Sequence, residues 1–151
     1  MPVEAVNSNL IRARDVDAIT PDPVLLSGIT RITTGEVDNA ADASSGSAYH
    51  LCDLPSACLL DPSSFVVVDG WGFASIRLGT AGTVDALISV LKSAGPVATP
   101  VAAGDAKYDK RLWEILGFAE DPGGMIGIYA HAIAAATAAG KLRFRFATIL
   151  N

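Results

Sequence analysis

The stretch GKLRFRFATIL (Gly140–Leu150) decides the fold class, because apolar and polar side chains alternate along it. One face carries Leu142, Phe144, Phe146, Thr148 and Leu150, and the other carries Lys141, Arg143, Arg145, Ala147 and Ile149. Successive side chains leave a strand in opposite directions, so a period of two predicts a strand with one buried face. A buried face of this length needs a second layer to cover it. We therefore expect a β protein of two layers.

The residues just before this stretch predict a hairpin. Met125–Ala132 is expected to form a strand, and AIAAATAAG (Ala132–Gly140) is expected to form the small-residue tip that joins it to the last strand. A strong turn signal, Asp121-Pro122-Gly123-Gly124, precedes both.

Strand patterns also occur upstream. Gly28–Val37 is rich in β-branched residues, and Tyr49–Leu54 alternates until Pro55 ends it. Phe65–Asp69 (FVVVD) is expected to be a buried strand, with Phe73–Leu78 (FASIRL) as its hairpin partner across the Asp-Gly turn. An Asp-Gly pair between two such runs is a strong hairpin signal.

Two segments allow both a helix and a strand. In Thr83–Leu91 the apolar residues have helical spacing, with Thr83 as the N-cap and Gly95 beyond the end, so we favour a helix over a strand. Arg111–Phe118 fits a strand or one helical turn, and an all-β setting favours the strand. The expected fold class is therefore mainly β: a jelly-roll-like antiparallel β-sandwich with at most one or two short helices.

Residues 1–27 differ from the rest and are expected to be an extended N-terminal arm, with residues 28–151 as the β-sandwich domain. The segment contains three prolines and scattered charges but no aromatic residue, and proline favours extended backbone at and before its position. A frayed terminus is one interpretation. The other is an arm that becomes ordered against a neighbouring subunit. Its apolar anchors would then be Val3, Val6, Leu10, Ile11, Val16, Val24, Leu25 and Leu26.

The composition favours a protein partner. Half of the residues are hydrophobic and 18% are charged. A surface short of charge is often covered by another subunit, although an alanine-rich composition alone would look similar. The net charge of −5, with no Lys/Arg cluster beyond Lys141, Arg143 and Arg145, argues against nucleic acid as a partner.

The sequence shows no signal peptide and no apolar run of transmembrane length, so we expect a soluble protein that is made in the cytoplasm and has no membrane partner. Cys52 and Cys58 are expected to be buried free thiols, with a disulfide as the less favoured alternative.

No pattern of catalytic residues stands out, so we expect no enzyme, no cofactor and no metal. His50, Cys52 and Asp53 lie at spacings that should not converge on one ion from a strand. His131 should face the same side as Met125 and Tyr129 and contribute to packing or to an interface. The serines have no histidine base in a nucleophile elbow, and the glycines match no phosphate loop.

From about Ser47 onward the chain resembles small virion proteins of tailed bacteriophages that decorate or cement the capsid. The likeness is carried by SAYHLCDLP (Ser47–Pro55), VVVDGWGFASIRLGT (Val66–Thr80), GDAKYDKRLWEILG (Gly104–Gly117) and the DPGG turn with its closing strands. It implies a jelly-roll-like sandwich that forms a homotrimer on the outer surface of the virion head, with the major capsid protein as partner and no enzymatic residues.

This resemblance makes a structural role the leading hypothesis: the protein would cement the capsid by bridging neighbouring major capsid subunits. A tail-associated or head-tail connector protein is one alternative. A glycan-binding sandwich that stacks sugars on Trp71, Trp113 and Tyr108 is another. Trp71 would be a lid over the sandwich edge or an interface anchor. The expected contact residues are Val3, Val6, Leu10, Ile11, Val16, Leu25, Trp71, Lys107, Tyr108 and Trp113.

Overall fold

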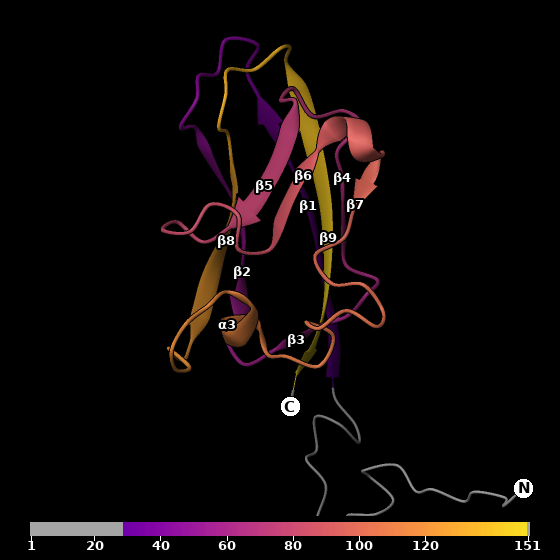
Figure 1. Cartoon of the computed structure of the whole chain (residues 1–151), viewed down its shortest axis with the longest axis vertical. Helices are drawn as coiled ribbons and strands as arrows, with labels where there is room; N and C mark the ends of the chain where they lie inside the picture. The colour runs from indigo at the N-terminus through magenta and orange to yellow at the C-terminus, as the bar shows by residue number, and fades with distance from the viewer. Residues whose placement is uncertain (1–28, 151) are drawn as a thin grey trace, which may run out of the picture.

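The computed structural model describes residues 29–150, which fold into two antiparallel sheets packed face to face (Figure 1). The five-stranded sheet has the order β1-β9-β4-β7, with β3 also paired to β9. Its strands are β1 (Ile29–Asn39), β3 (Leu59–Leu60), β4 (Phe65–Val67), β7 (Val97–Ala98) and β9 (Gly140–Leu150). The four-stranded sheet has the order β2-β8-β5-β6. Its strands are β2 (Ala48–Pro55), β5 (Ser75–Gly79), β6 (Ile88–Leu91) and β8 (Met125–His131). The predicted antiparallel β-sandwich is confirmed.

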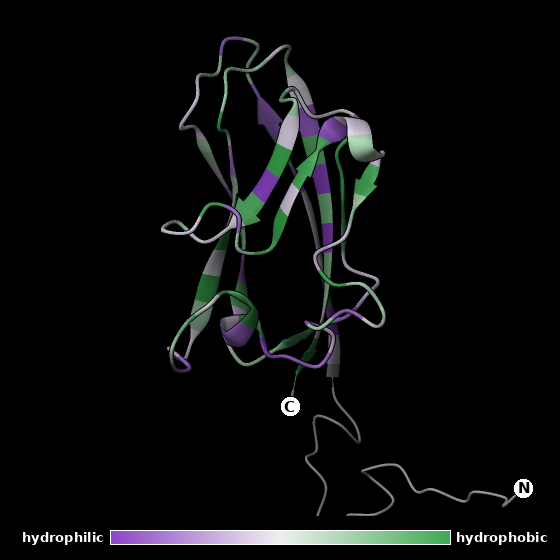
Figure 2. Cartoon of the chain, in the orientation of Figure 1, coloured by the Kyte–Doolittle hydropathy of each residue, from purple (hydrophilic) through white to green (hydrophobic). Residues whose placement is uncertain are grey.

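Strand β9 is paired along both edges. It runs beside β1 through a continuous register from Ile29↔Leu150 to Asn39↔Gly140, and its other edge holds β4 and β3. The predicted alternation is confirmed from Leu142 to Phe146, where Arg143 is exposed and its neighbours Leu142 and Phe144 are buried; beyond it Ala147, expected on the polar face, is buried as well. Bands of differing hydropathy along β9 and β5 show the same period (Figure 2).

The two sheets share one hydrophobic core. The largest fully buried side chains are Trp71, Phe146, Leu54, Ile76, Leu78, Leu112, Ile128, Leu142, Val66, Val68, Val101 and Thr148. They come from both sheets and from the connections between them. Burying a side chain of this size stabilises the fold by roughly 1.5–3 kcal/mol each, so the sandwich depends on this shared interior.

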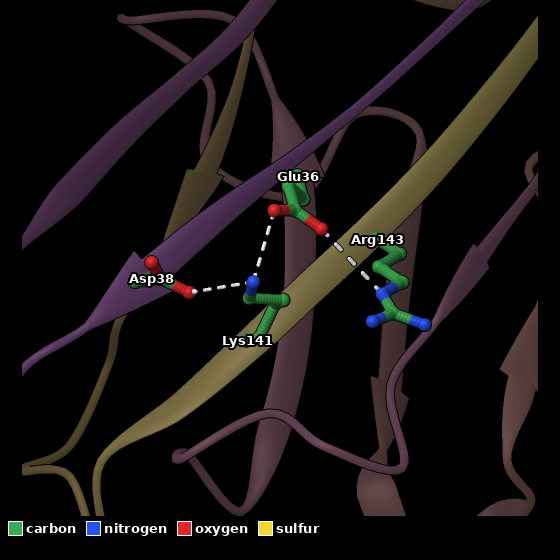
Figure 3. A network of polar contacts seen from close by, with 4 residues as sticks. All are labelled: Glu36, Asp38, Lys141 and Arg143. Atoms are coloured by element: carbon green, nitrogen blue, oxygen red, sulfur yellow. Dashed lines mark hydrogen bonds and ion pairs between the residues drawn. The ribbon is translucent and has the colours of Figure 1, made fainter.

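The outer face of the five-stranded sheet carries the three alternating cations, and two of them have acidic partners across the β1–β9 ladder (Figure 3). Lys141 Nζ lies 2.9 Å from Glu36 Oε1 and 3.7 Å from Asp38 Oδ1, and Arg143 Nε lies 3.6 Å from Glu36 Oε2. These side chains are solvent-exposed, so the network adds little to stability and chiefly matches the register of the two strands.

The contribution of this network to the stability of the fold depends on pH, and the direction follows from the pKa shifts of Glu36 and Lys141. The hydrogen bond from Lys141, aided by the charges of Lys141 and Arg143, lowers the pKa of Glu36 below its ordinary value of 4.5. The same bond, with the charge of Asp38, raises the pKa of Lys141 above 10.5. The stabilisation from Glu36 is therefore present above pH 4.5 and is lost as the pH falls through the lowered pKa. That from Lys141 is present below pH 10.5 and is lost as the pH rises through the raised pKa.

Both predicted hairpins are wrong, because each connection crosses from one sheet to the other. β8 and β9 lie in different sheets, as do β4 and β5. The Asp-Gly turn instead passes under the loop before β9: Gly70 O accepts from Lys141 N at 2.7 Å, and Gly72 O accepts from Thr137 N at 2.8 Å. An added Cβ at Gly72 would lie 2.1 Å from Ala138 O, so glycine permits this close crossing.

The predicted helix over Thr83–Leu91 is also wrong. Residues 84–87 form turns, and Ile88–Leu91 is the edge strand β6, paired with β5. Leu87 and Ile88 are buried, whereas Leu91 is 62% exposed, so the helical spacing does not correspond to one buried face. The alternative that Ile88–Leu91 is a strand is the correct one, because pairing with β5 outweighs a local helical preference.

The predicted strand at Arg111–Phe118 is wrong as well, since Leu112–Ile115 forms the short helix α3. Its first turn is capped, because Arg111 N donates to Glu114 Oε2 at 2.9 Å. The N–H groups of Leu112 and Trp113 donate to Cys58 O and Ser56 O at 2.8 and 3.1 Å. The connection from β2 to β3 thus supplies the acceptors that a helix start requires. A 3-10 helix, η1 (Lys92–Ala94), is the other short helix among the described residues.

Asn39 fastens three segments where the sheets cross. It is 4% exposed, its Nδ2 donates to Ala138 O at 2.9 Å and to Ala40 O at 3.0 Å, and its Oδ1 accepts from Gly72 N at 3.1 Å. The amide thus joins the end of β1 to the Asp-Gly crossing and to the loop before β9.

We predict that Asn39→Ala lowers the free energy of unfolding by about 1 to 3 kcal/mol, because it leaves the buried Gly72 N–H without a partner. Urea unfolding followed by tryptophan fluorescence measures the change. The control is Thr34→Ala at an exposed position of the same strand, where we expect a change within about 0.5 kcal/mol. Equal stability of the two variants would contradict the role assigned to Asn39.

Candidate functional site

The outer face of the four-stranded sheet carries a row of side chains from β8. Met125, Gly127, Tyr129 and His131 face outward, and they alternate with the buried residues Ile126, Ile128 and Ala130. The prediction that His131 shares a side with Met125 and Tyr129 is therefore confirmed. His131 Nε2 lies 2.8 Å from Thr80 O, which ties this row to the turn after β5.

A bulge in β2 adds an ion pair to this face. The β2–β8 register runs from His50↔Tyr129 directly to Cys52↔Ile128, so Leu51 is the extra residue. The bulge changes the alternation, and His50 and Asp53 come together with Nε2 and Oδ1 2.8 Å apart. His50 and Asp53 thus meet on the outer face, although their spacing in a regular strand would place them on opposite faces. Cys52 instead packs against the core.

The aromatic rings stand next to one another across the two strands. The His50 and Tyr129 rings are stacked, with centroids 4.5 Å apart and an interplanar angle of 11°. Tyr129 and His131 are 6.1 Å apart at 30°. Gly127 leaves the space for this arrangement, because an added Cβ would lie 2.9 Å from Tyr129 Cε2 and 3.3 Å from both Asp53 Oδ1 and His50 Nε2.

Two surface segments turn this face into a groove of about 660 Å³. One wall is the turn Thr80–Thr83, and the other is the segment after α3. The lining consists of Asp53, Thr80, Ala81, Gly82, Thr83, Leu116, Gly117, Phe118, Pro122, Met125, Ile126, Gly127 and Tyr129. Phe118 and Met125 are 40% and 57% exposed, which is unusual for large apolar side chains. Among the described residues the lining contains one carboxylate and no Lys or Arg, so this part of the chain gives the groove apolar walls and a single negative charge.

The first wall depends on a glycine in β5. Gly79 ends that strand, and an added Cβ there would lie 1.9 Å from Thr83 O. The turn is closed by hydrogen bonds from Thr80 N to Thr83 O at 2.9 Å and from Thr83 N to Thr80 Oγ1 at 3.0 Å. The turn therefore packs directly on the sheet and holds its position beside Tyr129.

The second wall is fixed by Asp121, which follows α3 and precedes Pro122. Its Oδ1 accepts from Ser56 Oγ at 2.6 Å and from Gly123 N at 2.8 Å. The Ser56 hydrogen bond is the main reason that the pKa of Asp121 lies below its ordinary value of 3.8, so this carboxylate is ionised at neutral pH.

The two cysteines are free thiols, as predicted, and Cys58 is fully buried. Burial raises the pKa of Cys52 to about 12, with a smaller contribution from the charge of Asp53. Burial also raises the pKa of Cys58 to about 12. Neither side chain is a thiolate nucleophile at neutral pH. Residues 29–150 contain no group of three or more His, Cys, Asp or Glu side chains placed to hold a metal ion.

The structure separates the contact residues expected from the sequence. Trp71 is 1% exposed and packs on Tyr49 and Phe73, with ring centroids 5.2 and 5.1 Å away. It is therefore a core residue, and an anchoring role for its side chain at an interface is wrong. Tyr108 is 51% exposed beside β3, Lys107 is half-buried next to it, and Trp113 is half-buried on α3. The remaining positions, Val3, Val6, Leu10, Ile11, Val16 and Leu25, lie outside the described residues.

The stacking platform suggested for glycans does not form. Trp71 is next to Gly72, whose N–H donates to Asn39 at the end of β1. Trp113 belongs to α3, which lies at the opposite end of the sandwich, near the start of β1 (Figure 1). Sequence reasoning placed the aromatic surface at these residues and missed the groove around Tyr129. No local pattern signalled this groove, because His50 and Asp53 meet only through the bulge in β2.

Compared with known proteins, the chain matches no family model, no curated protein and no solved structure. Within the described part of the chain, no helix has the length and apolar character needed to span a membrane.

We predict that Gly127→Ala disrupts the ring row while leaving the fold intact. The new methyl group would push Tyr129 away and separate His50 from Asp53, because these atoms lie within 3.3 Å of its position. The imidazole resonances of His50 in an NMR spectrum should shift as the stacked Tyr129 ring moves. The control is Gly82→Ala in the groove wall, where an added Cβ meets nothing within 4 Å. Unchanged His50 resonances in Gly127→Ala would refute the crowding argument.

Proposed function

We propose that this protein is a structural virion protein that decorates and cements a bacteriophage capsid, bridging neighbouring major capsid subunits as a homotrimer on the outer surface of the head. In this proposal it catalyses no reaction, and its role is to hold other subunits in place. The resemblance of the sequence to phage decoration proteins motivates the proposal, and the surface of the sandwich supports it.

The supporting observation is the apolar character of the sheet edges. Among the described residues, three of the five strands that have an unpaired edge carry large exposed apolar side chains. Ile32 on β1 is 51% exposed, Leu91 on β6 is 62% exposed, and Val97 on β7 is 50% exposed. Natural sandwiches usually protect their edges with charge, proline or bulges, because an open edge offers unpaired backbone groups to another chain. Apolar edges therefore favour a protein that works in contact with other subunits.

The rigidity of the sandwich suits this role. β9 is held on both edges, and a single core unites both sheets. A cementing protein must transmit force between the subunits that it joins, so a body with little internal freedom is an advantage. Several weak contacts made at once would strengthen binding, because each contact raises the effective concentration of the others.

We predict a trimer in solution that depends on the adjacent edges β6 and β7. The double variant Leu91→Asp/Val97→Asp should dissociate into monomers, because it places charges in an apolar contact. Mass measurement by light scattering on a sizing column reports the result. Val84→Asp is the matched control, since this side chain is 39% exposed in a turn away from the edge strands. A double variant with the mass of the wild type would exclude this interface.

We also predict that removal of residues 1–27 leaves a folded trimer that no longer binds capsids. The reason is that the arm, which lies outside the described residues, supplies the grip on adjacent capsid subunits in this proposal. Cosedimentation of the truncated protein with capsids that lack the decoration protein measures occupancy. Full occupancy by the truncated protein would show that the sandwich alone is sufficient.

A further inference from the structure

We propose that the groove on the outer face of the four-stranded sheet binds an arginine side chain flanked by apolar residues, presented by the major capsid subunit. The inference rests on the proposed function for the identity of the partner. The chemistry of the occupant comes from the groove itself, through its single carboxylate, its aromatic floor and its apolar walls.

The charge of the groove selects a cation. Asp53 is its one charged lining residue, and the side chain of Asp53 is 53% exposed. Its Oδ1 lies 2.8 Å from His50 Nε2, whereas its Oδ2 makes no hydrogen bond or ion pair with residues 29–150. A cationic donor that enters the groove therefore meets one carboxylate oxygen that can accept a hydrogen bond, with no Lys or Arg in the lining to repel it.

The shape and the apolar content select arginine over lysine. Tyr129 lines the groove beside Asp53, and a planar guanidinium can pack against the ring face that His50 does not cover while it donates to a carboxylate. Met125 and Phe118 extend the groove with exposed apolar surface that suits the methylene stem of arginine and an apolar neighbour. A lysine ammonium is a compact, strongly hydrated charge and would use only the carboxylate.

His50 has a defined part in this site. It competes for Asp53 through the 2.8 Å contact and stacks on Tyr129. It therefore holds the carboxylate beside the aromatic ring when the groove is empty. Removing the imidazole frees Oδ1 of Asp53 in addition to Oδ2, so arginine binding should persist without His50. If the His50–Asp53 pair served only to stabilise the fold, arginine binding would not persist in this way after His50 is removed.

The test is a titration of the ¹⁵N-labelled full-length protein with the peptide acetyl-Gly-Leu-Arg-Phe-Gly-amide. The amide signals of Gly82, Gly117 and Gly127 report on both walls and on the floor of the groove. The matched peptide carries citrulline in place of arginine, which keeps the shape and removes the charge. We expect the citrulline peptide to bind about tenfold more weakly or worse, because its neutral N–H groups make a weaker hydrogen bond to the carboxylate than a charged guanidinium does.

Three variants of the full-length protein separate the possible causes. Asp53→Asn should weaken binding of the arginine peptide about tenfold or more. His50→Gln should bind it at least as tightly as the wild type. Asp42→Asn removes an exposed carboxylate that is not part of the groove and should bind it like the wild type. Equal binding of the arginine and citrulline peptides, or unchanged binding by Asp53→Asn, would overturn the proposal.

Capsid cosedimentation and mass measurement distinguish this inference from the proposed function. Peptide binding that requires Asp53, in a protein that never binds capsids, would keep the groove chemistry and refute the capsid as its partner. Normal capsid occupancy by Asp53→Asn would also refute the capsid arginine as occupant, while the decoration role would stand. Loss of the trimer in Asp53→Asn would assign the groove to a second copy of this chain and would overturn the proposal. Reduced occupancy with an intact trimer is the expected result.

Discussion

Pairing along both edges of β9 is the constraint on which the rest of this structure depends. β1 follows one edge through an unbroken register, and β4 and β3 share the other. The strand can therefore place Phe144 and Phe146 against the opposite sheet without exposing its own backbone. Phe144 gains further room from Gly35 directly across the ladder, where an added Cβ would lie 2.6 Å from the Phe144 ring. This pairing fixes β1, β3 and β4 beside β9 and presents the buried face of β9 to the other sheet, which forms the core.

The connections between the sheets depend on backbone contact at glycine. The crossing at Gly70–Gly72 touches the loop before β9 closely enough that a side chain at Gly72 or Gly140 would overlap backbone atoms. Asn39 then satisfies the polar groups that this crossing buries. Trp71 lies between the sheets because its turn is a crossing and not the tip of a hairpin, so a residue that looks exposed in the sequence forms part of the core.

The groove arises from small departures from regular strand geometry. One extra residue at Leu51 brings His50 and Asp53 to the same face, and Gly127 leaves space beneath them for Tyr129. Bulges and glycines commonly re-aim side chains near functional sites. The surrounding sandwich is otherwise regular, so its exposed apolar edges and this groove are the surfaces that set it apart. Both are suited to contact with other proteins, which is why a bridging role and an arginine-binding groove are compatible proposals.

The sequence by itself determined the fold class, the face of β9 that is buried, the strands at β1, β2 and β8, and the free thiols. Each follows from a period of two, from β-branched content or from residue type, which are local properties. The tertiary structure alone decided which strands pair. The Asp69–Gly72 and Ala132–Gly140 connections look like hairpin turns in the sequence, but each joins strands of different sheets, and Trp71 in the first is buried between them. It also decided β6, which forms by pairing with β5 against the local helical spacing, and α3, whose first N–H groups bind acceptors distant in the chain. The His50–Asp53 contact belongs to the same class, because it depends on a one-residue shift against β8 that no local pattern records.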